Sequence, residues 1–251
     1  MPLDVILVPG LWLDGSTWTD VADRLAAAGH SPHPLTLRGL ASRTSDRRGI
    51  MLADHVAEIV DVIDRADGAV VLVGHAEACG LVHAAVNRRP ERIARVIHVG
   101  GFPSADGTRV LSASAIDLRT KPVDVVVRDL TDPVLQARYQ RISENGAQAI
   151  DSVQRLTDER RYSVPTTIVA TEYRVDDVLR WVRVGVDLTR ELRRMTDLTL
   201  VDLPSGRWPQ MERADELARL ILEQTAPQLT FPTVPTPTIA PATASTATAD
   251  A

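Results

Sequence analysis

The chain has 251 residues, of which 44% are hydrophobic and 24% are charged, and these fractions are ordinary for one globular α/β domain with an insertion. The formal net charge of -5 argues against nucleic acid as a partner, because phosphates attract basic surfaces. The single cysteine, Cys79, excludes an intramolecular disulfide and a cysteine-rich metal site.

The sequence also lacks the signals of membrane insertion and export. No apolar run reaches the roughly 20 residues that a membrane-spanning helix needs. Met1 leads directly into a predicted strand, with no basic region followed by an apolar one. We therefore expect a cytoplasmic protein, monomeric or homodimeric, without a membrane partner.

Short apolar runs alternate with helical periodicity in the first part of the chain. The run at 4–8 predicts a buried strand that Pro9 and Gly10 end, and a helix over 16–28 follows. A second strand is predicted over 33–37 and a second helix over 53–66.

The stretch from Val70 to Leu81 is the centre of the sequence pattern. A β-branched run leads into small residues, and a helical pattern begins at once and ends before Pro90. This order of strand, sharp turn and helix is typical of a nucleophile elbow, which lifts one side chain above a parallel sheet. The motif position is Ala76, whose methyl group cannot attack a substrate.

The alternation breaks after a strand over 95–99 and resumes later. Residues 105–161 are irregular, with possible helices over 133–142 and 147–156, and predict a small cap over the sheet. Further elements are expected in this order: a strand at 166–170, helical pieces over 176–195 split near Gly185, a strand at 198–203, and a helix at 210–224.

Strands that alternate with helices imply a mainly parallel sheet. We predict an α/β core over 1–104 and 162–225, with the cap between them. Residues 226–251 are rich in Thr, Pro and Ala without apolar periodicity, so we expect an extended or mobile tail.

Four segments together resemble the α/β-hydrolase fold, and specifically its small bacterial esterase-like branch. The resemblance covers about 5–222, and its segments are Val8–Trp12, Leu37–Leu40, Val73–Ala78 and Leu203–Pro209. It implies a mainly parallel sheet with helices on both faces and a small helical cap.

The resemblance also implies roles for particular positions. Backbone N–H groups of Leu11 or Trp12 and of Glu77 match the oxyanion hole. Ala76 holds the nucleophile position and Arg207 the histidine position. The acid of the family would be Glu172, Asp176 or Asp177.

The two replacements remove the hydrolytic mechanism that the resemblance would imply. No histidine lies beyond residue 98, and an arginine cannot act as a general base near neutral pH. Without nucleophile and base, Ser-His-Asp chemistry is not expected.

Arg207 has two open interpretations that can both hold. Its planar fork of donors suits a carboxylate, phenolate or enolate. Alternatively it pairs with the leftover acid, Glu172 or Asp176. Glu77 could be a general acid or base at the pocket rim, or a solvated first-turn residue, and the latter is favoured.

The remaining candidates concern the pocket wall and floor. The expected substrate-binding residues are Trp12, Ala76, Phe102, Arg207 and Trp208, with Trp12 also a tentative catalytic residue. Cys79 is expected to be a buried, inert thiol, and His75 to bind nearby backbone. We expect no metal and no cofactor, because no phosphate loop, metal cluster or dinucleotide motif is present.

Three functional classes therefore compete. The first is a cofactor-free lyase, cyclase or isomerase of secondary metabolism that acts on a small, anionic or aromatic metabolite. The second is a pseudoenzyme that binds a ligand or partner. The third is a hydrolase with an unusual nucleophile, such as Cys79 or a water activated by Glu77.

Overall fold

The sheet of the protein is fully parallel. The computed structural model describes residues 2–10, 13–41, 45–46, 48–109 and 152–225. Its six-stranded sheet has the order β2-β1-β3-β4-β5-β6. The strands span Asp4–Val8 (β1), Ser31–Pro34 (β2), Val70–His75 (β3), Ile93–Val99 (β4), Thr166–Ala170 (β5) and Leu198–Asp202 (β6).

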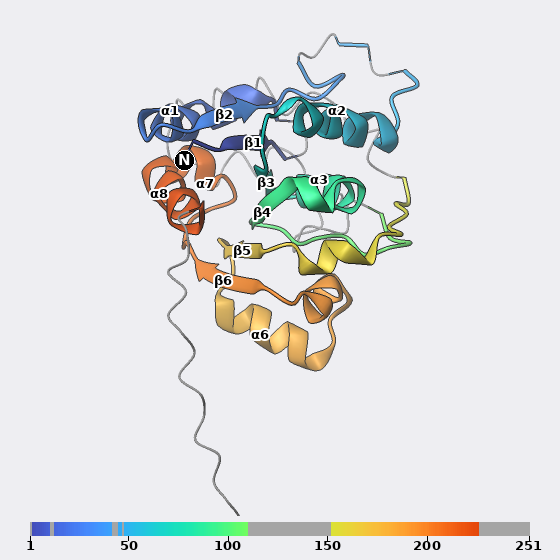
Figure 1. The fold of residues 1–251 in the computed structure, drawn as a ribbon. Helices are drawn as coiled ribbons and strands as arrows, with labels where there is room; N and C mark the ends of the chain where they lie inside the picture. Colours follow the sequence, from blue (N-terminus) through green and yellow to red (C-terminus); the bar gives the residue numbers. More distant parts are fainter. Residues whose placement is uncertain (1, 11–12, 42–44, 47, 110–151, 226–251) are drawn as a thin grey trace, which may run out of the picture.

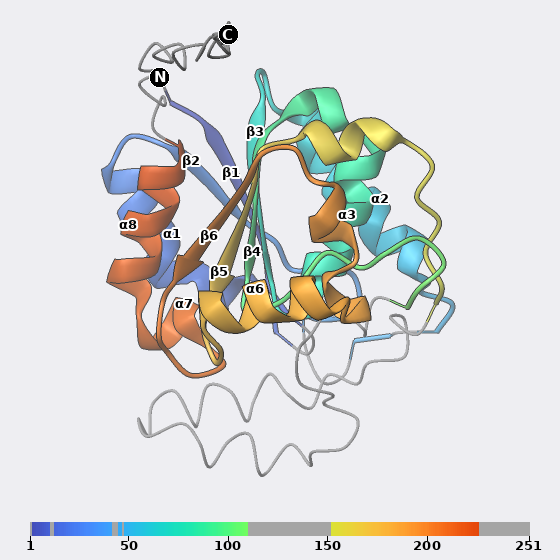
Figure 2. The ribbon, with the colours of Figure 1, turned by 90° about the horizontal axis from the view of Figure 1, so that it is seen from below.

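Helices cover both faces of this sheet (Figures 1 and 2). The helices are α1 (Thr19–Ala27), α2 (Leu52–Arg65), α3 (Ala78–Arg88), α6 (Val175–Val184), α7 (Pro209–Glu212) and α8 (Ala214–Thr225). Figure 2 shows α1 and α8 on one side of the sheet and α2 and α3 on the other.

Side chains alternate between the two faces of the sheet along each strand, and this explains why a helical layer packs on each face. Val5 and Leu7 pack with α1 and α8, whereas Ile6 and Val8 pack with α2 and α3. Because both faces are covered, the central strand β3 is buried along its whole length. The predicted fold class is therefore confirmed.

The second strand begins two residues and ends three residues earlier than predicted. It spans Ser31–Pro34, not 33–37, and contains two prolines. Proline is tolerated there because β2 is the edge of the sheet and needs ladder hydrogen bonds on one side only. Leu37 instead turns into the core, where it is 2% exposed.

Two predicted helices are divided. The predicted break near Gly185 is confirmed, since α6 ends there with a left-handed φ of 79°. The chain beyond it forms two 3-10 turns, Asp187–Thr189 and Glu191–Arg194, instead of α-helix. The predicted last helix is split into α7 and α8 at Arg213, whose φ of -137° is not helical.

The predicted cap is described only where its chain leaves the core and returns to it, and these two segments form backbone hydrogen bonds with each other. We call residues 104–109 and 152–158 the neck. Arg109 and Val153 form an antiparallel bridge, and Gln154 N donates to Thr108 O at 3.0 Å. Because these backbone groups pair across the neck, the helix predicted over 147–156 is wrong for 152–156. The helix predicted over 133–142 and the tail over 226–251 lie outside the described residues, and the domain limits stay a prediction.

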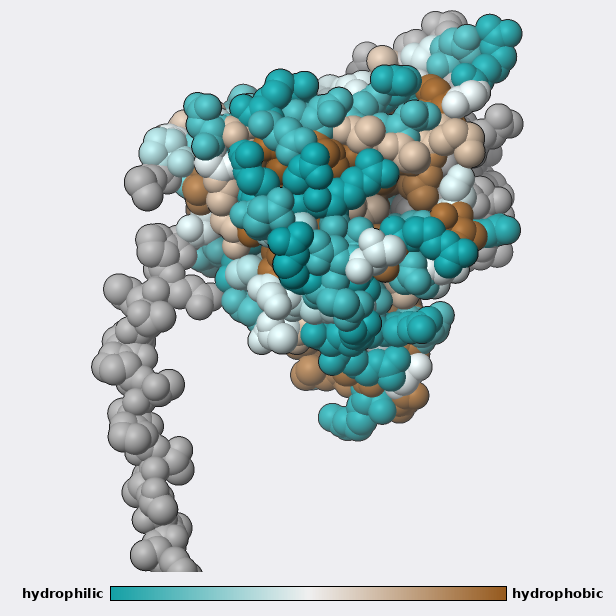
Figure 3. Space-filling view, turned by 45° about the vertical axis from the view of Figure 1, so that its right-hand side comes forward, coloured by the Kyte–Doolittle hydropathy of each residue, from teal (hydrophilic) through white to brown (hydrophobic). Residues whose placement is uncertain are grey.

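The face of the molecule in Figure 3 is mostly polar. Figure 3 shows a largely hydrophilic face with apolar groups at its lower end, where α6 lies. Leu179 and Val184 of α6 are 46% and 70% exposed. Within the described ranges, no helix is long and apolar enough to cross a membrane.

Candidate functional site

The turn between β3 and α3 has the strained backbone of a nucleophile elbow. Ala76 has a φ of 49°, the only positive φ of a non-glycine residue in the described chain. Such a conformation costs about 1–3 kcal/mol, and strain of this kind concentrates at functional sites. Ala76 N donates to Val99 O at 2.8 Å, which holds the turn against β4.

Close packing around the turn depends on glycines. A Cβ added at Gly101 would lie 2.4 Å from Ala76 O, and one at Gly74 would lie 2.7 Å from Val82 Cγ2. Neither position accepts a side chain without movement of the backbone or the helix. The frame of the elbow is thus retained although Ala76 carries no nucleophile.

Arg207 lies beside two carboxylates at this turn. Its Nη2 is 3.3 Å from Glu77 Oε1, and its Nη1 is 3.8 Å from Glu172 Oε2. The Arg207 and Glu77 side chains are 9% and 4% exposed, whereas that of Glu172 is 30% exposed. The nearer and more buried partner is therefore Glu77, which the sequence reasoning had not paired with Arg207.

The other two acid candidates point elsewhere. Asp176 is exposed in the first turn of α6 and is not an ion-pair partner of Arg207. Asp177 binds Arg174 N and pairs with Arg180 at 2.5 Å. Of the three candidate acids, the structure brings only Glu172 to Arg207.

The favoured interpretation of Glu77 as a solvated residue is wrong. Glu77 precedes α3 directly and is 3% exposed. A buried carboxylate needs a charged or hydrogen-bonding neighbour, and the guanidinium of Arg207 supplies one. Sequence reasoning missed this because Arg207 is 130 residues away along the chain.

His75 fixes the backbone of Arg207. Its Nε2 is 2.8 Å from Arg207 O, so Nε2 carries the proton and donates it, and Nδ1 accepts from Gln210 Nε2 at 3.3 Å. Burial lowers the pKa of His75 to about 4, so the imidazole is neutral at pH 7. With both nitrogens engaged, His75 acts as a positioning residue for the Arg207 segment.

Trp208 completes this packing. Its ring lies 5.6 Å from the His75 ring, and the Arg207 guanidinium carbon lies 5.7 Å from the Trp208 ring centroid. Trp208 is only 2% exposed. The Trp208 ring therefore lies beside the Arg207 guanidinium, and Trp208 also stays a candidate for the pocket wall.

Cys79 has the properties of a structural thiol. It is fully buried, and its Sγ donates to Gly74 O at 3.3 Å. Burial raises the pKa of Cys79 well above its ordinary value, so the thiolate is not formed near neutral pH. This geometry argues against Cys79 as an alternative nucleophile.

An aromatic cluster adjoins the turn on the β5 side. Phe102 follows Gly101, is fully buried, and stacks on Tyr173 with centroids 5.4 Å apart. Trp181 packs against Tyr173 at 5.3 Å. Phe102 thus lies within the cluster, and Tyr173 is an additional aromatic side chain that sequence reasoning missed. The signal for it was its place just after β5, because loops that follow parallel strands meet at one edge of the sheet.

Within the described part of the chain, three buried polar atoms near this edge have no hydrogen-bond partner: Arg207 Nε, Thr171 Oγ1 and Tyr173 Oη. Buried polar groups are almost always satisfied, so three such atoms in adjoining loops are unusual. Each can donate a hydrogen bond to an anion or a carbonyl. Leu11 and Trp12, the other expected oxyanion and wall residues, lie outside the described residues.

The sequence and the fold are both similar to those of known proteins. The sequence matches the model of the alpha/beta hydrolase family over residues 5–220, so the chain belongs to this family. No curated protein sequence gave a match.

Solved structures of the same fold agree with this assignment. An extracellular alpha/beta-hydrolase from a Paenibacillus species has 16% identity and a TM-score of 0.69, covering 89% of this chain and 99% of its own. A pyrethroid hydrolase from Sphingobium faniae has 17% identity and a TM-score of 0.63, covering 90% and 99%. Tomato methylketone synthase I, complexed with 2-tridecanone, has 15% identity and a TM-score of 0.66, covering 89% and 97%. At these identities the likeness concerns the fold alone.

Proposed function

We propose that this member of the alpha/beta hydrolase family is non-hydrolytic and binds a small anionic or aromatic metabolite at the elbow. The observation that carries the proposal is the Arg207 side chain, 9% exposed and held 3.3 Å from Glu77 at a strained turn that has a methyl group in place of a nucleophile. A fixed cation with a partly unpartnered fork is suited to an anion, not to proton abstraction from a serine.

The activity that we favour is that of a cofactor-free lyase, cyclase or isomerase in secondary metabolism. Arg207 would stabilise a carboxylate, phenolate or enolate, and backbone N–H groups of Leu11 or Trp12 and of Glu77 would stabilise a developing oxyanion. Trp12, Ala76, Phe102 and Trp208 would shape the ligand. Glu77 would hold the Arg207 guanidinium in place, so catalysis would depend mainly on orientation and charge.

Two of the similar structures are compatible with this proposal. One is of a protein named as a synthase and complexed with a methyl ketone, so its name does not describe a hydrolase. Another is described as sharing structural and functional homology with a tobacco salicylic acid binding protein. Salicylate is a small aromatic anion, which is the chemical class that Arg207 favours.

The second candidate function is a pseudoenzyme that binds the same class of ligand without turnover. The observation in its favour is that Arg207 already has two carboxylate neighbours. The third candidate, a hydrolase with Cys79 as nucleophile, is disfavoured by the burial and raised pKa of that thiol.

Calorimetric titration with benzoate and its neutral isostere benzamide tests the anion site. We expect benzoate to bind the parent protein more tightly, Arg207→Ala to reduce this preference about tenfold or more, and Arg207→Lys to reduce it less. Arg183→Ala, an exposed change on α6, is the matched control and should have no effect. Equal losses of benzoate and benzamide binding in Arg207→Ala would reject the anion-binding role.

A further inference from the structure

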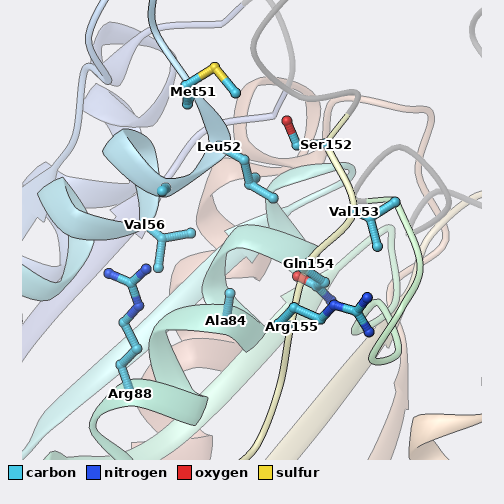
Figure 4. A pocket seen from close by; sticks show the side chains of 10 residues that line it. Met51, Leu52, Val56, Ala84, Arg88, Ser152, Val153, Gln154 and Arg155 are labelled. Atoms are coloured by element: carbon cyan, nitrogen blue, oxygen red, sulfur yellow. The ribbon is translucent and has the colours of Figure 1, made fainter.

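A cavity lies away from the elbow, between α2, α3 and the neck. It has a volume of about 280 Å³, near the lower end of ligand pockets. Figure 4 shows α2 on one side, residues 152–155 of the neck on the other, and Ala84 of α3 between them. Arg88 at the end of α3 is roughly 15 Å from the elbow at its start, from the helical rise of 1.5 Å per residue.

The lining of this cavity is mainly apolar. Leu52, Val56 and Ala84 form its buried part, with exposures of 6%, 3% and 7%. Met51 and Val153 lie at the rim and are 56% and 50% exposed. These two are among the few large apolar side chains that the described surface exposes, so an apolar occupant would remove them from water at a gain of about 25 cal/mol per Å².

The charge of the cavity is positive in a chain whose net charge is negative. Arg88 and Arg155 line it, and the part of its lining that the structure describes contains no aspartate or glutamate. Figure 4 places Arg88 and Arg155 on opposite sides of Ala84.

Neither arginine forms an ion pair with another residue that the structure describes. Among the described residues, the neighbouring Arg89 and Arg160 are paired with Asp64 and Asp158, whereas the side chains of Arg88 and Arg155 have no acidic partner. Two unpaired guanidinium groups beside an apolar surface favour a ligand that carries both an anionic group and an apolar body.

We propose that this cavity binds a small amphipathic carboxylate. Its apolar chain would lie along Leu52, Val56 and Ala84, and its carboxylate would be bound by Arg88 or by Arg155, which lie on opposite sides of Ala84. Because Arg155 belongs to the neck, the occupant would also fix the neck against α3. This site does not depend on the proposed function of the elbow.

Octanoate is a suitable probe, with octanol as its neutral counterpart. Titrations of the isotopically labelled full chain, followed by amide NMR shifts and calorimetry, should show saturable octanoate binding with shifts centred on Ala84 and Val153. We expect Arg88→Gln and Arg155→Gln each to weaken this binding about two- to fivefold, as for exposed ion pairs. Val153→Glu, a change at a half-exposed position, should weaken it more by placing a carboxylate at the rim.

The control variants separate this site from the elbow and from general surface charge. Arg183→Gln should leave the shifts and the affinity at the cavity unchanged, and Arg207→Gln should remove only shifts around the elbow. Failure of benzoate binding at the elbow would therefore leave the octanoate result intact, and the reverse also holds.

Several outcomes would overturn the proposal. These are no saturable binding at millimolar octanoate, equal affinity for octanol, or octanoate shifts confined to the elbow. A dimer that dissociates in Val153→Glu without any ligand would assign the cavity to a second copy of the chain instead.

Discussion

Replacing Arg207 by methionine tests whether the pair at the elbow is a buried ion pair. The change removes a guanidinium that is 3.3 Å from the Glu77 carboxylate, while methionine keeps most of the apolar volume of the arginine stem. The two charged side chains are 9% and 4% exposed, so water cannot readily replace the lost cation.

The expected cost follows from this burial. Removing one partner of a buried pair costs about 3–5 kcal/mol. We expect the lower end, about 3 kcal/mol, because the contact is not short and because the Glu172 contact at 3.8 Å, with a 30% exposed carboxylate, adds little. For a chain of this length, that cost corresponds to a fall in Tm of about 6–12 °C.

The loss of unfolding free energy in Arg207→Met should also depend on pH. Without the guanidinium, burial raises the pKa of the Glu77 carboxyl in the folded variant. A raised folded pKa leaves stability intact at low pH and loses it as the pH rises through that value. The deficit relative to the parent should therefore be smaller at pH 5 than at pH 7.5.

Urea denaturation followed by tryptophan fluorescence measures these free energies. Arg180→Met is the matched control, since its pair with Asp177 is at the surface and should cost less than about 1 kcal/mol. A double-mutant cycle with Glu77→Gln should give a coupling energy of about 2 kcal/mol. If Arg207→Met costs no more than Arg180→Met, or if the coupling is near zero, the reasoning about the elbow pair is refuted.

Three further predictions concern the same frame. Ala76→Gly should stabilise the protein by up to about 1 kcal/mol, since glycine adopts the positive φ without strain, and a clear loss of stability in urea would contradict this. Cys79 should react with a thiol reagent only at the rate of unfolding; rapid labelling of the native protein would show that the thiol is accessible. The free energy of unfolding should fall as the pH drops from about 7 toward 4. Burial holds the pKa values of His75, His83 and His98 below the ordinary 6.5. In this pH range the unfolded chain therefore binds more protons than the folded chain. His75, with a pKa of about 4, contributes roughly 3 kcal/mol of this loss, and a Tm that does not change between pH 7 and 5 would refute the assignment.

Periodicity predicted the central sheet well because both of its faces are buried. The strand at 166–170 was predicted at its observed bounds, and the turn before α3 was recognised from the small residues that its packing requires. The predicted position of the edge strand β2 was wrong because the strand contains Pro32 and Pro34. Prolines are tolerated only in an edge strand, and the sequence alone did not show which strand is the edge.

The site was less predictable because its contacts join distant parts of the chain. The position of Arg207 was deduced from the family pattern, yet its partner Glu77 was taken for a solvated residue. A first-turn glutamate is usually exposed, and only the loop that carries Arg207 buries it. Likewise, His75 was expected to bind nearby backbone, but its partner is a carbonyl 132 residues away.

The central claim is that the elbow no longer hydrolyses esters, and steady-state turnover of p-nitrophenyl butyrate tests it most directly. We predict no saturable turnover by the parent protein and none gained by Ala76→Ser, because Arg207 cannot act as a base and the nitrogens of His75 are both engaged. Saturable hydrolysis by the parent, or hydrolysis by Ala76→Ser well above it, would contradict the claim.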